Sequence, residues 1–161
     1  MKNKTLIAYY SHSGNTRAIA ELIQSKTNGT MYGLEPKTSY PSPYDAVLGQ
    51  ARQEIGAGAR PELATTISDL DSYEFIFIGT PNWLDTYAPP IATFLDSGDF
   101  SGKVLIPFCT HGGGGGGKIE ADITSQCPNA TVMPALVVQG NGGARITDTI
   151  DSWLRKIQFP L

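Results

Sequence analysis

Short apolar runs alternate along the chain with segments whose apolar residues recur every three or four positions. Apolar runs predict buried strands at residues 5–10, 75–78 and 104–108, with weaker strand patterns at 31–34 and 132–138. Helical spacing, or a proline pair in the first turn, predicts helices at about residues 15–26, 44–55, 89–95, 119–125 and 146–157. In the second of these helices, Tyr44, Val47, Ala51 and Ile55 mark one face.

The alternation of strands and helices predicts an α/β fold. Nearly continuous apolar strands are typical of a parallel sheet that is covered by helices on both faces. Five such strands most often form a doubly wound parallel sheet in the order 2-1-3-4-5, and we expect one domain spanning residues 1–161. We expect Gly79 and Pro81 to end the third strand, and Pro134 to interrupt the last strand or to lie at a bulge.

Composition narrows the possible partners. The 161 residues carry a net charge of −3, with no cluster of Lys or Arg, which argues against nucleic acid as a partner. Two cysteines are too few for a disulfide framework, and the histidines show no metal-ligand spacing, so no metal is expected. The first apolar run is too short for a signal peptide or a membrane span. We therefore expect a cytoplasmic protein without a membrane partner.

The candidate functional residues are concentrated where strands one, three and four are predicted to end. In a doubly wound sheet, ligands bind beyond the carboxyl ends of the strands, where the winding reverses. The loops that follow these three strands are residues 11–16, 80–87 and 110–117, and they are also the most unusual in composition. We therefore expect one binding site at this edge of the sheet.

The first loop has the composition of a phosphate site. A helix N-terminus offers unpaired backbone N–H groups and a positive dipole end, three hydroxyls add donors, and a glycine lets the backbone approach closely. The candidate phosphate-binding residues are Ser11, His12, Ser13, Gly14, Asn15 and Thr16. The alternative is an ordinary helix-capping loop with Ser13 or Asn15 at the N-cap.

Two of the loops resemble those of a known family. Ser11-x-Ser13-Gly14-Asn15-Thr16 after the first strand is similar to the phosphate loop of flavodoxins, which bind the 5′-phosphate of flavin mononucleotide (FMN). Residues 79–85 resemble the flavodoxin segment that places an aromatic residue against the flavin ring, which implies that Trp83 stacks on FMN. The alternative is that Trp83 covers the sheet edge. The further cofactor-binding candidates in this loop are Thr80, Pro81, Asn82, Leu84 and Tyr87, of which Tyr87 could equally pack at the helix start.

The third loop departs from the flavodoxin pattern. Many flavodoxins carry a tyrosine and an acidic residue there, whereas this chain has six consecutive glycines, whose backbone could lie along the flavin ring. A flexible linker is the alternative. The cofactor-binding candidates are Thr110, His111, Gly112, Gly113, Gly114 and Gly117. His111 is also the candidate catalytic residue, since a histidine can exchange protons near neutral pH.

Two functions remain open at this point. One is an FMN-binding electron-transfer protein that serves redox partner proteins or small quinone-like acceptors. The other is an FMN-dependent NAD(P)H:quinone oxidoreductase, in which a homodimer could complete the substrate pocket. A flavin-binding module without turnover is a third and simpler class. The chain does not match the P-loop of nucleotide-hydrolysing proteins, because Ile119 follows Lys118 at the position where that loop requires Ser or Thr.

Overall fold

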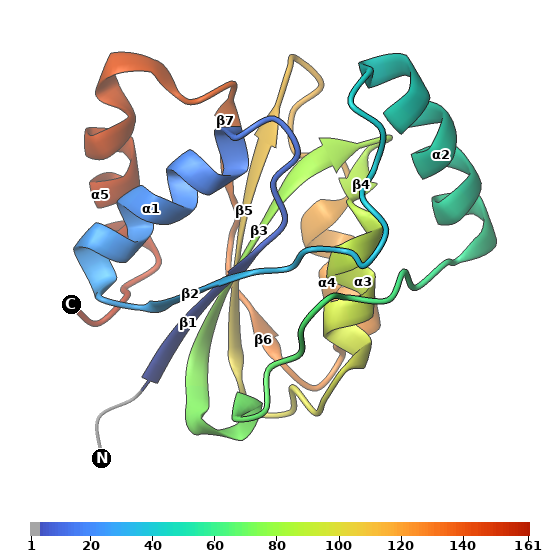
Figure 1. Ribbon diagram of the computed structural model, residues 1–161. Coiled ribbons are helices and arrows are strands. Elements are labelled where there is room, and N and C mark those ends of the chain that lie inside the picture. Colours follow the sequence, from blue (N-terminus) through green and yellow to red (C-terminus); the bar gives the residue numbers. More distant parts are fainter. Residues whose placement is uncertain (1–3) are drawn as a thin grey trace.

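The computed structural model describes residues 4–161 and contains a central sheet between two layers of helices (Figure 1). The strands are β1 (Lys4–Tyr9), β2 (Thr30–Gly33), β3 (Tyr73–Trp83), β4 (Thr86–Tyr87), β5 (Val104–His111), β6 (Thr131–Val132) and β7 (Leu136–Gln139). The helices are α1 (Asn15–Thr27), α2 (Tyr44–Ala57), α3 (Pro89–Asp96), α4 (Ile119–Gln126) and α5 (Ile146–Lys156). Two short 3₁₀ turns, η1 (Leu70–Ser72) and η2 (Gly143–Arg145), precede β3 and α5.

The sheet has the predicted order. Its strands run β2-β1-β3-β5-β6, with β7 also paired to β5, and all of these pairs are parallel. Counted without the short β4, this order is 2-1-3-4-5, so the doubly wound α/β architecture is confirmed. All the parallel strands therefore end at one edge of the sheet, and the loops that follow them lie together there (Figure 1).

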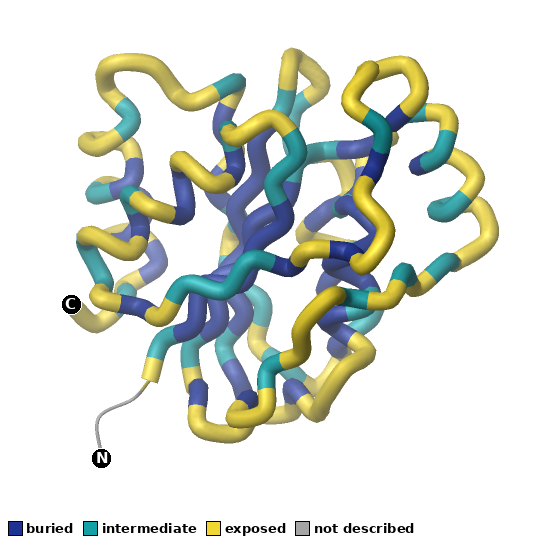
Figure 2. The backbone as a smooth tube through the Cα atoms, viewed as in Figure 1, coloured by how far each residue is buried: buried dark blue, intermediate teal, exposed yellow. Residues whose placement is uncertain are grey.

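Each face of the sheet carries its own apolar core. Alternate residues of β1 show this: Leu6 and Ala8 belong to one buried cluster, and Ile7 and Tyr9 belong to the other. Helices α2, α3 and α4 cover the first cluster, whereas α1 and α5 cover the second (Figure 1). Burial is concentrated in the strands between these layers (Figure 2). Within residues 4–161, no helix is both long and apolar enough to cross a bilayer.

The structure corrects the end of one predicted strand and shows the interruption expected at Pro134 in another. Gly79 and Pro81 do not end β3, because β3 stays paired with β5 through Pro81↔Thr110 and then turns back as a hairpin onto β4. The last predicted strand is two strands, β6 and β7, with Pro134 in the gap between them. Both β6 and β7 pair with β5, so the interruption does not change the order of the sheet.

Candidate functional site

The three loops chosen from the sequence do meet at the carboxyl edge of the sheet. They enclose two adjoining hollows, an inner cavity of about 230 Å³ and a more open outer cavity of about 580 Å³. The inner cavity is lined by His12, Ser13, Asn15, Tyr44, Pro81, Asn82, Trp83, Thr110, His111, Gly112 and Gly140. The outer cavity is lined by Tyr44, Asn82, Leu84, Asp85, His111, Gly112, Gly113 and Gly114. Most of the site residues predicted from the sequence are therefore brought together.

The first loop presents free backbone donors to the inner cavity. Gly14 occupies the N-cap of α1 with a φ of 99°, so neither Ser13 nor Asn15 is the N-cap. The Ser11 hydroxyl oxygen accepts hydrogen bonds from the N–H groups of Gly14 and Arg17, both at 3.2 Å. The N–H groups of Asn15 and Thr16 find no acceptor within the described residues 4–161. Two N–H groups at the start of a helix therefore remain available to an anion.

Thr16 and Thr110 join the first loop to the third. Their hydroxyl oxygens lie 2.8 Å apart, and both side chains are buried. One hydroxyl donates to the other, so the second hydroxyl keeps a hydrogen for another acceptor. Thr110 also lines the inner cavity, whereas Thr16 does not. The pair therefore fixes the spacing between the start of α1 and the end of β5.

Asn82 holds the second loop against the third. Its side-chain amide donates to the carbonyl of Gly115 at 2.7 Å, and its side-chain oxygen accepts the N–H of Asp85 at 2.9 Å. Leu84 and Asp85 form the turn between β3 and β4 with φ values of 56° and 68°, a left-handed conformation that is costly for both residues. Gly117 packs directly on this turn, because an added Cβ would lie 2.5 Å from the carbonyl oxygen of Asp85.

Trp83 is largely enclosed. Its ring lies edge-to-face with the rings of Tyr10, Tyr40 and His12, at centroid distances of 5.5, 5.0 and 5.9 Å. Only 3% of the residue is exposed. The Tyr40 hydroxyl donates to Glu54 at 2.5 Å. The pKa of Tyr40 is raised, chiefly because the residue is buried and also because of the neighbouring Glu54 carboxylate. Trp83 therefore forms a wall of the inner cavity and leaves little ring surface free.

The glycine loop is open and is organised by His111. The His111 Nδ1 atom accepts the N–H of Gly113 at 3.0 Å, which assigns the hydrogen of the neutral ring to Nε2. His111 borders both cavities, so its ring lies where it can donate from Nε2. An added Cβ on Gly112 or Gly113 would meet no atom within 4 Å. The loop thus offers backbone to a ligand and places no side chain over it.

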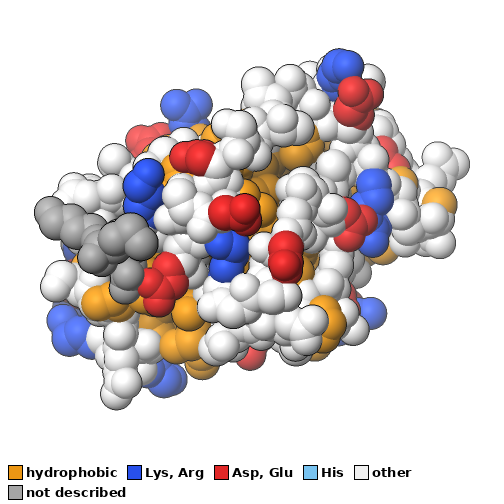
Figure 3. Space-filling view, turned by 90° about the horizontal axis from the view of Figure 1, so that it is seen from below, with side chains coloured by type: hydrophobic (Ala, Val, Ile, Leu, Met, Phe, Trp, Pro, Cys, Tyr) orange, Lys and Arg blue, Asp and Glu red, His pale blue; other side chains and the backbone are white. Residues whose placement is uncertain are grey.

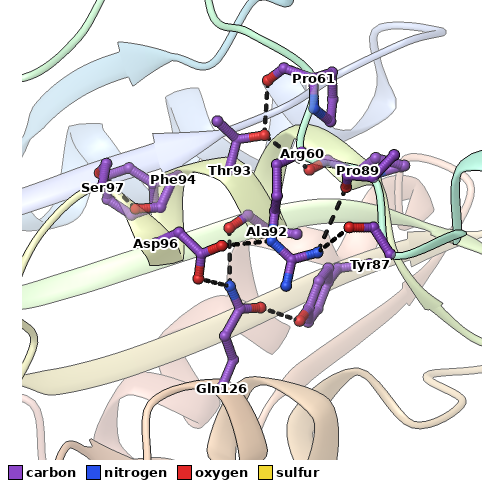
Figure 4. A network of polar contacts seen from close by, with 12 residues as sticks. Arg60, Pro61, Tyr87, Pro89, Ala92, Thr93, Phe94, Asp96, Ser97 and Gln126 are labelled. Carbon is purple, nitrogen blue, oxygen red and sulfur yellow. Dashed lines mark hydrogen bonds and ion pairs between the residues drawn. The ribbon is translucent and has the colours of Figure 1, made fainter.

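Tyr87 and Thr80 do not reach the cavities. The Tyr87 hydroxyl donates to the side-chain oxygen of Gln126 on α4, away from the loop cluster (Figure 4). Burial is the main factor that raises the pKa of Tyr87 to about 12. The Thr80 hydroxyl is buried between the carbonyl of Pro81 and the N–H of Ala88. These two residues shape the β3–α3 connection and do not face the site.

The match to known proteins decides the family. Residues 4–157 match the family model described as Flavodoxin. The chain belongs to the flavodoxin family. The family that the sequence resembled is therefore confirmed.

Solved structures and a curated relative agree with this assignment. A flavoprotein structure from Bacteroides eggerthii is 25% identical, with a TM-score of 0.87 over 99% of this chain and 100% of that one. A flavoprotein from Lactobacillus acidophilus, solved in complex with FMN, is 24% identical, with a TM-score of 0.75 over 94% of this chain and 99% of that one. An "NAD(P)H dehydrogenase (quinone)" from Cupriavidus metallidurans is 29% identical over 69% of this chain. The aligned part spans only 60% of that relative's length.

Three cavity residues of this flavodoxin-family site were missed by the sequence analysis: Tyr44, Asp85 and Gly140. Gly140 follows β7 at the same sheet edge and lines the inner cavity. The glycine-rich run 140–143 after the last strand is a signal that could have found it. Tyr44 at the start of α2 lines both cavities, but its place in an apolar helical stripe made it look like a core residue.

Proposed function

We propose that this protein binds FMN without covalent attachment and transfers electrons to and from redox partner proteins. The single observation that supports this most directly is the pair of free N–H groups at Asn15 and Thr16, at the start of the helix where Asn15 lines the inner cavity. No acidic side chain lines that cavity among the described residues. A phosphate can therefore be held there by backbone donors and a helix dipole, with no cationic side chain in the loop.

The residues present fit the rest of FMN as well. The two cavities together fall within the roughly 300–1,000 Å³ typical of small-molecule sites. The exposed backbone of the glycine loop can approach a flat ring closely, and His111 can donate a hydrogen bond to it from Nε2. FMN, when bound, supplies the one- and two-electron chemistry that amino-acid side chains lack. The chain's own part is to bind and orient this group.

The proposal is tested by titrating the purified protein with FMN and with riboflavin. Each hydrogen bond to a charged group contributes about 1.5–3 kcal/mol. FMN should therefore bind at least about tenfold more tightly than riboflavin, since about 1.4 kcal/mol is a factor of ten. The flavin absorbance of the complex reports binding directly. Equal affinities for the two flavins would contradict the assignment of residues 11–16 as the phosphate site.

A second candidate function is FMN-dependent NAD(P)H:quinone oxidation. It is favoured by the name of the Cupriavidus relative and by the open outer cavity. Among residues 4–161, no Lys or Arg that could hold the phosphates of a nicotinamide nucleotide lines that cavity. We therefore expect dithionite or a reductase protein to bleach the flavin absorbance readily under anaerobic conditions, and NADPH alone to do so slowly. Rapid bleaching of the flavin by NADPH, with turnover when quinone is added, would favour the reductase function over electron transfer between proteins.

We also propose the compartment, the partners and the oligomeric state of the protein. We expect the protein to act in the cytoplasm. Redox partner proteins are the expected partners, and small quinone-like acceptors are the alternative. If the protein is a reductase, a homodimer would supply further walls for the outer cavity. Sedimentation of the FMN complex would determine whether the chain is a monomer.

A further inference from the structure

Tyr44 has an exposure that its position in α2 does not explain. Tyr44, Val47 and Ala51 are spaced for one face of the helix, and Val47 and Ala51 are fully buried against the sheet. Tyr44 is nevertheless 63% exposed. A large aromatic ring on the buried face of a helix normally covers something. Here the helix begins at the carboxyl edge of the sheet, and the space beside Tyr44 is occupied by the two cavities.

The segment before Tyr44 fixes where the ring lies. Tyr40 is buried beside Trp83 and is held by its hydrogen bond to Glu54. Pro41 and Pro43 restrict the chain that leads to the helix, and the carbonyl of Pro43 accepts the N–H of Val47 at 3.0 Å. Tyr44 is therefore positioned by a restricted segment next to the wall that Trp83 forms. An exposed ring that is positioned in this way loses little conformational freedom when a ligand covers it.

The two aromatic residues of the cavity differ in how much ring they can offer. Trp83 is enclosed by three other aromatic rings, whereas Tyr44 borders both cavities and is largely uncovered. The glycine loop that faces Tyr44 across the outer cavity supplies no ring either. Stacking on a flat ligand requires an accessible aromatic face.

We infer that Tyr44 is the residue whose ring packs on the flavin of bound FMN, in the position that the sequence pattern suggested for Trp83. This inference rests on the proposed FMN binding. Trp83 then acts as a rigid wall behind the site, and the start of α2 becomes the fourth segment of the binding site beside the three loops. The interaction is with the ring system, so it does not depend on the phosphate.

The first experiment compares variants of Tyr44 by titration with both flavins. Tyr44→Ala should weaken FMN and riboflavin by the same factor, about three- to tenfold, the affinity equivalent of an aromatic stacking contact. Tyr44→Phe and Tyr44→Trp keep a flat ring and should stay within about twofold of the wild type. The control is Asp45→Ala, which alters the next exposed residue in the same helical turn and should leave both affinities unchanged.

Each outcome separates this inference from the proposed function. If the wild-type protein binds FMN and Tyr44→Ala binds both flavins as tightly, Tyr44 does not stack and the inference is wrong. A loss for FMN alone would also overturn it, because it would assign Tyr44 to the phosphate. If the wild type binds neither flavin, the proposed function itself fails.

A second measurement uses the unaltered chain. Tyr44 is far more exposed than the other tyrosines, which are buried or half-buried. Nitration with tetranitromethane, followed by peptide mass spectrometry, should therefore modify Tyr44 first in the protein without flavin. Saturating FMN should slow nitration of Tyr44 at least about fivefold if the ring is covered. Equal nitration rates with and without FMN would contradict the inference without any variant.

Discussion

The two ends of the sheet differ in how completely their polar groups are bonded. At the amino end, the buried Lys103 directs its ammonium group at the carbonyls of Leu70 and Tyr73, at 3.2 and 2.7 Å. At the carboxyl end, the N–H groups of Asn15 and Thr16 find no acceptor within residues 4–161. These two carbonyls at the amino end thus have a donor, whereas the two N–H groups at the carboxyl end remain available.

The loops at the carboxyl end also have an unusual backbone conformation. The amino-end face, seen in Figure 3, carries acidic and basic side chains close to one another. The carboxyl end contains the glycine loop and the turn in which two consecutive non-glycine residues, Leu84 and Asp85, adopt a positive φ. Elsewhere positive φ occurs at single non-glycine residues, Asn28 and Gln158. Unsatisfied donors and local strain are typical of binding sites, because the ligand or the surrounding structure compensates for them. Substitutions at the two ends should therefore change different properties.

The largest expected effect is at Lys103. Lys103→Met removes the ammonium, so the carbonyls of Leu70 and Tyr73 lose this donor in a site where the residue is only 8% exposed. The Leu70 carbonyl still accepts the backbone N–H of Tyr73. We expect the free energy of unfolding to fall by about 2–4 kcal/mol in urea titrations, with FMN affinity unchanged. The control is Lys37→Met, which breaks an exposed ion pair with Glu62 and should cost less than about 1 kcal/mol. If the two variants had the same free energy of unfolding, the hydrogen bonds of Lys103 would not stabilise the amino end of the sheet.

The fold at both ends was predictable from the sequence, but the exact course of β3 was not. The strand order and the position of the site follow from hydrophobic patterning and from the rule that ligands bind beyond the carboxyl ends of parallel strands. Pro81 looked like a strand end because proline lacks an N–H. In the structure, the pairing of β3 with β5 continues through Pro81, so long-range pairing overrides that local signal.

The aromatic residues show why the site was only partly predictable. The sequence indicates that Trp83 and Tyr44 are aromatic, but it does not indicate which ring keeps a free surface. That depends on packing between distant segments, since Tyr10 and Tyr40 enclose Trp83 from other parts of the chain. The two alternatives for Tyr87, contact with the flavin or packing at the helix start, could not be separated for a similar reason. Its partner Gln126 lies 39 residues further along the chain on α4 (Figure 4).

An intermediate effect is expected at the strained turn of the carboxyl end. Leu84→Gly removes the Cβ that makes a positive φ costly, while the unfolded chain gains freedom from the new glycine. The control is Leu84→Ala, which also removes the leucine side chain beyond the Cβ but keeps the Cβ itself. We expect Leu84→Gly to be more stable than Leu84→Ala by about 0.5–1 kcal/mol in thermal or urea unfolding of the protein without flavin. Greater stability for the alanine variant would show that the turn is not strained.

The smallest expected effect concerns Tyr32 on β2, between the two ends. Its hydroxyl is buried and has no hydrogen-bond partner within residues 4–161. Tyr32→Phe removes this unsatisfied group, so the free energy of unfolding should stay the same or rise by up to about 1 kcal/mol, with no change in FMN affinity. Tyr40→Phe is the matched comparison, because it deletes a hydroxyl that is bonded to Glu54 and should destabilise the protein by about 1.5–3 kcal/mol. The sign of the difference is the test. A destabilised Tyr32→Phe variant would mean that its hydroxyl has a partner in solution, and the contrast between satisfied and unsatisfied groups would then hold only at the ends of the sheet.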